Sequence, residues 1–492
     1  MTPTLVITVI TLYFGLLILI SYFTSKGATN ETFFTGNRQS PWYLVAFGMI
    51  GASLSGVTFI SIPGQVGNNE FYYFQIVLGY ILGYAVISYV LLPLYYKLNL
   101  ISIYTFLGDR YGKVTYKLGS FIFLISQLMG ASLRLFLAAG VLQIAIFDSM
   151  GVPFIVTVII TIALIWLYTY KAGIKTIVWT DTLQTLFMLL ALVLTIYIIK
   201  DELGFGFSEM VGQIRDSELS SVFYWDWKES NNFFKQFLAG AFIAICMTGL
   251  DQNMMQKNLT CKNLHEAQKN VTWFSWILIP VNLLFLGLGA LLYMYLAEKG
   301  IVQLGDFVFD PEKGRYLNTD DLFPQLAIHH FPVFAGIMFL LGITAAAFSS
   351  ADSALTSLTT AFCIDFLNIE KRPVHSQKRT RLQVHIAFSF IMALVIIVFD
   401  ALNDRSVISA VFTIAGYTYG PLLGLFSFGM FTKYKVQDKW VPLILFSPFI
   451  TYLFNNYSAE WLWGYKFGFE IIILNGLITF SILWLLHKFY SR

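Results

Sequence analysis

A row of hydroxyl groups and one carboxylate lies inside an apolar segment, AAAFSSADSALTSLTTAF at 345–362. If this segment is a helix, Ser349, Asp352, Ser353, Thr356 and Thr360 recur every three or four residues and share one face. Hydroxyl, carbonyl and carboxylate oxygens are the ligands that replace the water shell of a hard cation such as Na⁺. Small and hydroxyl residues also suit contacts between packed helices. Asp352 favours the cation site, because a carboxylate among apolar residues needs a partner.

A second segment, FGMIGASLSGVTFISIPG at 47–64, combines helix-breaking residues with hydroxyl groups. Its glycines are Gly48, Gly51, Gly56 and Gly64, and its hydroxyl residues are Ser53, Ser55, Thr58 and Ser61. Glycines let an apolar helix unwind, so that freed carbonyl groups can coordinate an ion and freed N–H groups can face a solute. Tight packing through small residues is the alternative. The density of both residue types favours a broken helix.

Three more charged residues lie in or beside apolar segments. Asp181 is either a ligand or an acid that stabilises a helix N-terminus through the helix dipole. Arg134 must pair or line water. Its partner is either the carboxylate of a solute or one of the aspartates, Asp352 and Asp181. Asp251 ends another apolar segment, where we expect a second helix to break.

The elements that must position these residues are membrane spans. The chain has 492 residues, of which 57% are hydrophobic and only 12% are charged, whereas about 25% are charged in soluble domains. Apolar runs long enough to cross about 30 Å of hydrocarbon recur along its length. We interpret the first, Leu5–Phe23, as a retained anchor, because it lacks the basic region and cleavage site of a signal peptide. We predict thirteen spans, at about 3–24, 41–66, 71–97, 116–147, 152–170, 176–199, 234–256, 270–296, 331–366, 382–400, 406–431, 439–456 and 467–489.

The distribution of basic residues predicts the orientation of these spans. Most of the 31 Lys and Arg fall in alternate loops, and Lys257, Lys262 and Lys269 are counted in the loop that follows the seventh span. The positive-inside rule then places the N-terminus outside and the C-terminus in the cytoplasm of a plasma or inner membrane. We expect short surface helices in the long outer loops, 200–233 and 297–330.

Several function classes are disfavoured by what the sequence lacks. It has no phosphate-binding loop of the Walker or kinase type, which argues against coupling to ATP hydrolysis. It shows no catalytic dyad or metal cluster, so we expect no enzyme, and no soluble signalling domain, which a receptor would normally carry. The expected partners are a small-molecule solute, Na⁺ and the lipid bilayer, without nucleic acid, and we expect a monomer.

Four motifs together resemble the sodium/solute symporters, a family that includes sodium–sugar, sodium–proline, sodium–iodide and sodium–sialic acid transporters. The motifs are GASLSGVTFISIPG, WTDTLQ at 179–184, DQNMMQKNL at 251–259 and AAAFSSADSALTSLTTAFCIDF at 345–366. The resemblance implies an all-α membrane protein with a leucine-transporter-like fold, a five-plus-five inverted repeat that works by alternating access. The chain would be one transporter domain, 1–492, with a peripheral helix at 3–24, repeats at 41–199 and 234–431, and peripheral helices at 439–489.

The resemblance also implies two cation sites. The general Na⁺ site would use the backbone carbonyls of Gly51, Leu54 and Ala346 and the side chains of Ser349 and Ser350. A second Na⁺ site would use Asp181, Ser349, Asp352 and Ser353. Asp352 departs from the sialic acid transporters, which carry a serine there. The extra carboxylate could strengthen a second cation site, pair with Arg134 or carry a proton.

For the solute, Ser53, Ser55, Thr58 and Arg134 match positions that contact the carboxylate of sialic acid and its neighbours. Tyr73, Gln75 and Asp251 complete the predicted contacts. The expected glutamine aligns with Val77, two residues from Gln75, and Asp251 stands where the sodium–galactose branch has an asparagine. The implied function is Na⁺-coupled uptake of a small organic solute, such as a carboxylate like sialic acid. A sugar, a monocarboxylate and a vitamin stay open.

Overall fold

The computed structural model describes residues 3–24, 26, 36–169, 173–402 and 407–490. In these residues nine helices are long and apolar enough to cross a membrane, and two further spans are pairs of helices joined at a bend. The nine contain α1 (Pro3–Thr24), α5 (Tyr73–Val86) with α6 (Leu92–Lys97), α8 (Lys113–Leu142), α10 (Gly173–Glu202), α14 (Leu264–Lys299), α16 (Val333–Ala361), α17 (Val374–Leu402), α18 (Val407–Phe431) and α20 (Ile471–Tyr490). The predicted all-α membrane architecture is confirmed.

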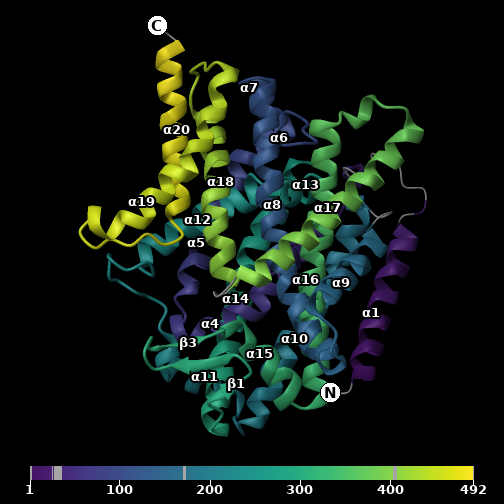
Figure 1. Cartoon of the computed structure of the whole chain (residues 1–492), viewed down its shortest axis with the longest axis vertical. Helices are drawn as coiled ribbons and strands as arrows, with labels where there is room; N and C mark the ends of the chain where they lie inside the picture. The colour runs from purple at the N-terminus through teal and green to yellow at the C-terminus, as the bar shows by residue number, and fades with distance from the viewer. Residues whose placement is uncertain (1–2, 25, 27–35, 170–172, 403–406, 491–492) are drawn as a thin grey trace.

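Every predicted span coincides with a helix, but two of these helices are too short to count as full membrane spans. The shorter helices are α7 (Thr105–Arg110), α9 (Phe154–Thr169), α11 (Phe207–Asp216), α15 (Leu322–Gln325) and α19 (Ser447–Trp461). Of these, α9 and α19 lie in predicted spans without meeting the length of a full span. Thirteen spans therefore stays a prediction. In Figure 1, α1 begins at the lower end of the molecule and α20 ends at the upper end, as an odd number of crossings requires.

Both predicted helix breaks are present. The first separates α3 (Trp42–Ser53) from α4 (Gly56–Asn69), which are bent by 52°. The second follows α12 (Phe233–Ala244), which continues as a wider turn to Gly249 and is bent by 71° from α13 (Gln252–Asn258). Leu54 (φ −84°, ψ 73°) and Asp251 (φ −105°, ψ 120°) leave the helical region at these points. Each break therefore exposes carbonyl groups that an unbroken helix would satisfy.

The helices around the breaks pack in a fixed order. α10 lies along α16 and α3, α14 lies along α3 and α4, and α5 lies along α12. α1 lies at the edge, in contact with α9, α10 and α16. α20 packs against α18 and α19 on the other side of the molecule.

The long loops only partly match the expectation of short helices. The first contains α11, as expected. The second instead forms an antiparallel sheet of β1 (Gln303–Leu304), β2 (Phe307–Asp310) and β3 (Arg315–Leu317), followed by a short turn of helix and α15. Gly305 and Gly314, at φ 58° and 60°, permit the two tight turns. The rings of Phe307 and Tyr316 stack with centroids 5.2 Å apart.

Glycines bring the backbones of α5 and α12 into direct contact. A Cβ atom on Gly79 would overlap the carbonyl oxygen of Phe237, and one on Gly240 would overlap that of Ile76. Small residues at a membrane helix interface allow this approach. The position of α12, and of the break that follows it, therefore depends on these two glycines.

We predict that Gly240→Ala destabilises the protein, because the added methyl group must push α12 away from α5. Overpacking of this kind costs about 1–3 kcal/mol, so the melting temperature of the protein purified in detergent should fall. Gly140→Ala in α8 is the control, since a Cβ there meets no atom within 4 Å. Equal melting temperatures for the two variants would contradict the prediction.

Candidate cation and solute site

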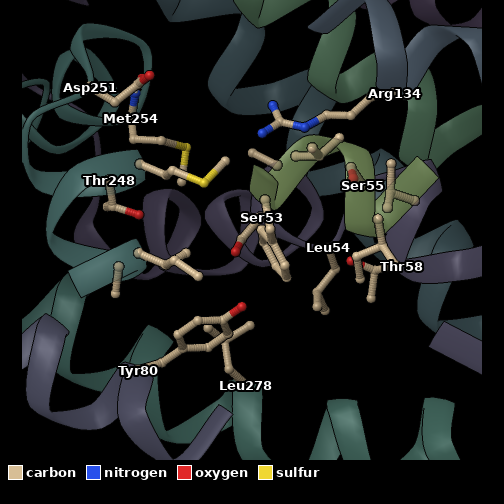
Figure 2. A pocket seen from close by; sticks show the side chains of 18 of the residues that line it. Ser53, Leu54, Ser55, Thr58, Tyr80, Arg134, Thr248, Asp251, Met254 and Leu278 are labelled. Atoms are coloured by element: carbon tan, nitrogen blue, oxygen red, sulfur yellow. The ribbon is translucent and has the colours of Figure 1, made fainter. Parts of the chain in front are cut away.

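The two helix breaks face each other across a cavity of about 90 Å³. Ser53, Leu54 and Ser55 line it from the first break, and Asp251, Asn253 and Met254 line it from the second (Figure 2). Of the predicted solute contacts, those that line the cavity are Ser53, Ser55, Thr58, Tyr73, Arg134 and Asp251. The structure thus brings together residues that are as much as 198 positions apart, from Ser53 to Asp251.

Gln75 does not line this cavity. Its side-chain nitrogen donates to the carbonyls of Tyr72 (3.2 Å) and Asn231 (3.0 Å). Its side-chain oxygen accepts from the N–H of Tyr224 at 3.2 Å. The amide therefore ties the start of α5 to the loop before α12, and we leave Gln75 out of the solute site.

Arg134 extends from α8 into the space between the two breaks (Figure 2). Among the described residues, its guanidinium group is not part of any ion pair, so the predicted pairing with Asp181 or Asp352 is absent. A guanidinium group offers a planar set of donors that matches a carboxylate. The cavity therefore presents a positive group, with hydroxyl groups nearby, to whatever occupies it.

Asp251 has its oxygen atoms engaged within the protein. One accepts the N–H of Met254 at 3.1 Å and so caps α13. The other accepts the hydroxyl of Tyr419, from α18, at 2.5 Å. Asp251 therefore fixes the direction in which the chain leaves the second break.

Asp181 is the centre of a second polar cluster, beside the α3–α4 break. One of its oxygens accepts the hydroxyl of Ser349 from α16 at 2.6 Å. The other accepts the ammonium group of Lys257 from α13, also at 2.6 Å. Lys257 and Asp181 are each only 1% exposed. The cluster therefore joins three helices through a buried ion pair.

The structure excludes one of the two alternatives for Asp181 and corrects the expected place of Lys257. Asp181 lies about two turns inside α10, which begins at Gly173, so it does not stabilise a helix N-terminus. Lys257 does not lie in a cytoplasmic loop, because the bend before α13 directs this short helix toward α10. Lys257 lies within the motif DQNMMQKNL, six residues after Asp251. That position was the one feature of the sequence that could have indicated a place inside the protein.

The predicted ligands of the general Na⁺ site lie where the first break meets α16. Leu54 ends α3, and a Cβ on Gly56, at the start of α4, would lie 3.3 Å from that of Ala347. Ser350 donates its hydroxyl hydrogen to the carbonyl of Ala346 at 3.3 Å, and Ser349 donates to Asp181. A hydroxyl group has one hydrogen and two lone pairs. Both serines therefore keep oxygen lone pairs for a cation.

Gly51 and Asp352, two further predicted cation ligands, each have a partner in the chain. The N–H of Gly51 donates to the hydroxyl of Thr185 at 3.0 Å, which holds α3 against α10. Asp352 is fully buried and accepts the hydroxyl of Ser353 at 3.1 Å. Asp352 does not line the cavity between the breaks.

Comparison with known proteins decides the family. Residues 33–438 match the model of the sodium:solute symporter family. The chain belongs to this family. The predicted resemblance is therefore confirmed, and Na⁺-coupled solute symport by alternating access is the function that membership gives the chain. Membership also classes it as a transporter and not an enzyme.

Relatives in the sodium:solute symporter family cover most of the chain. The sodium/sialic acid symporter NanT of Aliivibrio fischeri is 23% identical, over 86% of this chain and 82% of its own. The sodium/sialic acid symporter SiaT of Proteus mirabilis is 22% identical, over 95% and 93%. A solved structure of a Na⁺-coupled sialic acid symporter, outward-open and substrate-bound, matches with a TM-score of 0.81 at 19% identity and covers 98% of both chains. This likeness confirms the predicted fold.

We predict that Lys257→Met strongly destabilises the protein, because it leaves the Asp181 carboxylate buried without its counter-charge. Removing one partner of a buried ion pair costs about 3–5 kcal/mol. The double variant Asp181→Asn, Lys257→Met removes both charges and should lose less stability. The measurement is the melting temperature in detergent without Na⁺. If the double variant is as unstable as the single one, the ion pair is not the cause.

Proposed function

We propose that this chain takes up a small organic carboxylate together with Na⁺, and that Arg134 binds the carboxylate of the solute. The observation that carries the proposal is the guanidinium group, which faces the cavity between the two helix breaks without an ion-pair partner among the described residues. A charge in such a place is costly unless it is paired. A carboxylate solute supplies the missing partner.

The same reasoning ranks the solute classes. A neutral sugar would fill the cavity and leave Arg134 with only the attraction of Asp251, which lies beyond ion-pair distance and whose oxygens are already engaged by Met254 and Tyr419. Sialic acid, monocarboxylates and vitamins that carry a carboxylate all supply it. The relatives include monocarboxylate and multivitamin transporters, but NanT, SiaT and the solved structure that covers 98% of this chain favour sialic acid within this group. The hydroxyls of Ser53, Ser55 and Thr58 would then bind polar groups next to the carboxylate.

For the cation, we propose that Na⁺ binds between the first break and α16. Its ligands would be the carbonyls of Gly51, Leu54 and Ala346, with the hydroxyls of Ser349 and Ser350. The ligand set fits at two points. Gly51 and Leu54 lie at the end of α3, where carbonyls lack helical partners, and both serine hydroxyls have already donated their hydrogens and keep lone pairs. Ser53 and Ser55 of the same break line the solute cavity. A cation that orders this break would therefore also order the solute site.

Aromatic rings lie between the solute cavity and a second cavity, where they could close the path between the two. Tyr73 and Phe412 line both this cavity and a second one of about 410 Å³, which reaches the loop residues Ser230 and Asn231. Their rings stack with centroids 6.4 Å apart, and Phe469 packs edge-on against Phe412. We propose that these rings separate the solute from the side of the long loops, and part in alternating access.

The orientation and the repeat boundaries belong to the same proposal. Each bent pair begins a predicted repeat, at 41–199 and 234–431, as an inverted repeat would require. The distribution of basic residues supports an outside N-terminus and a cytoplasmic C-terminus. Epitope tags at the two ends, probed in intact and permeabilised cells, test the orientation.

We predict that Ser349→Ala and Ser350→Ala each raise the Na⁺ concentration for half-maximal uptake several-fold or more. Loss of one oxygen ligand from a buried cation costs about 1–3 kcal/mol. The measurement is solute uptake into proteoliposomes over a range of Na⁺ concentrations. Ser357→Ala is the control, since Ser357 lies on the same helix, is equally buried and donates to the carbonyl of Ala354. Unchanged Na⁺ dependence in both test variants would exclude these serines as ligands.

We predict that Arg134→Lys weakens the affinity for a carboxylate solute about tenfold or more, because an ammonium group cannot form the two parallel hydrogen bonds of a guanidinium group. Na⁺ binding without solute should persist. The measurement is equilibrium binding to the purified protein across sialic acid, monocarboxylates and sugars. A neutral sugar that binds best, with affinity unchanged in Arg134→Lys, would overturn the carboxylate proposal.

A further inference from the structure

The place implied for a second Na⁺ already contains a positive charge. A second Na⁺ would need the carboxylate of Asp181, but the ammonium group of Lys257 lies 2.6 Å from one oxygen and Ser349 donates to the other at 2.6 Å. Ser353, another implied ligand, donates to Asp352 instead. The ligands of a second Na⁺ are therefore engaged by groups of the chain itself.

We propose that Lys257 is a tethered cation that takes the place of a second Na⁺ at Asp181, so that this chain binds one Na⁺ per solute. The inference rests on the proposed function, since it concerns the cations that accompany the solute. It replaces the expectation of a second Na⁺ site at Asp181, Ser349, Asp352 and Ser353.

Electrostatics favours the tethered group over a free ion. Two cations on one carboxylate repel each other, so Na⁺ binds there only if the ammonium group leaves. A displaced ammonium group would remain buried and unpaired, which is unfavourable. The ammonium group of Lys257 also has a high effective concentration beside Asp181, because it is covalently attached to the same chain. Na⁺ from solution must overcome all three effects.

The surrounding structure fixes the position of the lysine. Asp251 caps the start of α13, and the hydroxyl of Tyr96 lies 3.1 Å from two carbonyl oxygens at its other end, those of Asn258, its last residue, and of Cys261. Asp181 is positioned by Gly48 of α3, which lets α10 approach closely. A Cβ added at Gly48 would lie only 3.1 Å from the Cβ of Asp181. Both ends of the short helix that carries Lys257 are therefore attached.

The test is the number of ²²Na⁺ ions bound per molecule of purified protein in detergent, without solute. We expect one in the wild type and two in Lys257→Met, where Na⁺ can reach the vacated carboxylate. The double variant Asp181→Asn, Lys257→Met should again bind one. Lys262→Met is the matched control, because Lys262 is five residues further along the chain and exposed, and it should bind one. Na⁺ should also raise the melting temperature of Lys257→Met more steeply than that of the wild type.

The outcomes separate this inference from the proposed function. Two ions in the wild type overturn the tethered cation and leave Na⁺ symport intact, whereas no bound ion overturns the proposed function itself. One ion in a folded Lys257→Met also overturns the inference. If Lys257→Met does not fold, the reversal potential of the wild type in proteoliposomes decides: one Na⁺ per solute supports the inference and two overturn it.

Discussion

A carboxylate inside a membrane protein has no bulk water to stabilise it, so the side chain of Asp181 must take its partners from the helices around it. It takes one from α16 and one from α13, through Ser349 and Lys257. The same serine is a proposed Na⁺ ligand, and the same short helix follows the second break. The geometry of the cation site and the direction of α13 therefore depend on one buried charge. If Asp181 is neutralised, α13 and α16 lose their common partner on α10.

The two breaks impose the other requirement on the fold. Each exposes backbone groups that lipid cannot satisfy, so each must lie against protein or a polar cavity. The first is enclosed by α10, α14 and α16, and the second is held by the contact of Asp251 with Tyr419. Close approach of the surrounding backbones depends on glycine, as at Gly79 and Gly240. The result is a cavity with exposed backbone, lined by Arg134 and by an Asp251 whose oxygens are already engaged. This arrangement suits the carboxylate and the cation of the proposed function.

The sequence predicted most of this arrangement, because apolar length and glycine density are local properties. Most of the spans and both breaks follow from them, and motif resemblance selected six residues, predicted to contact the solute, that line one cavity. The rest depends on contacts between distant segments. Gln75 binds a loop whose path the sequence does not reveal. The strands of the 297–330 loop are too short to show alternation. Lys257 resembled the basic residues that mark a membrane edge, and only the 71° bend turns it inward.

The charge beside Asp181 has a consequence for how far the solute can be concentrated. A monoanionic solute that moves with one Na⁺ carries no net charge, so the membrane potential adds nothing to its uptake. A tenfold Na⁺ gradient then supplies about 1.4 kcal/mol, enough for tenfold accumulation. A second Na⁺ would add the same amount again and, at 100 mV, about 2.3 kcal/mol from the net charge moved. In the proposed function, the cavity residues, with Arg134 foremost, select the anion. The occupant of the Asp181 site, Lys257 or a second Na⁺, sets how strongly its uptake is driven.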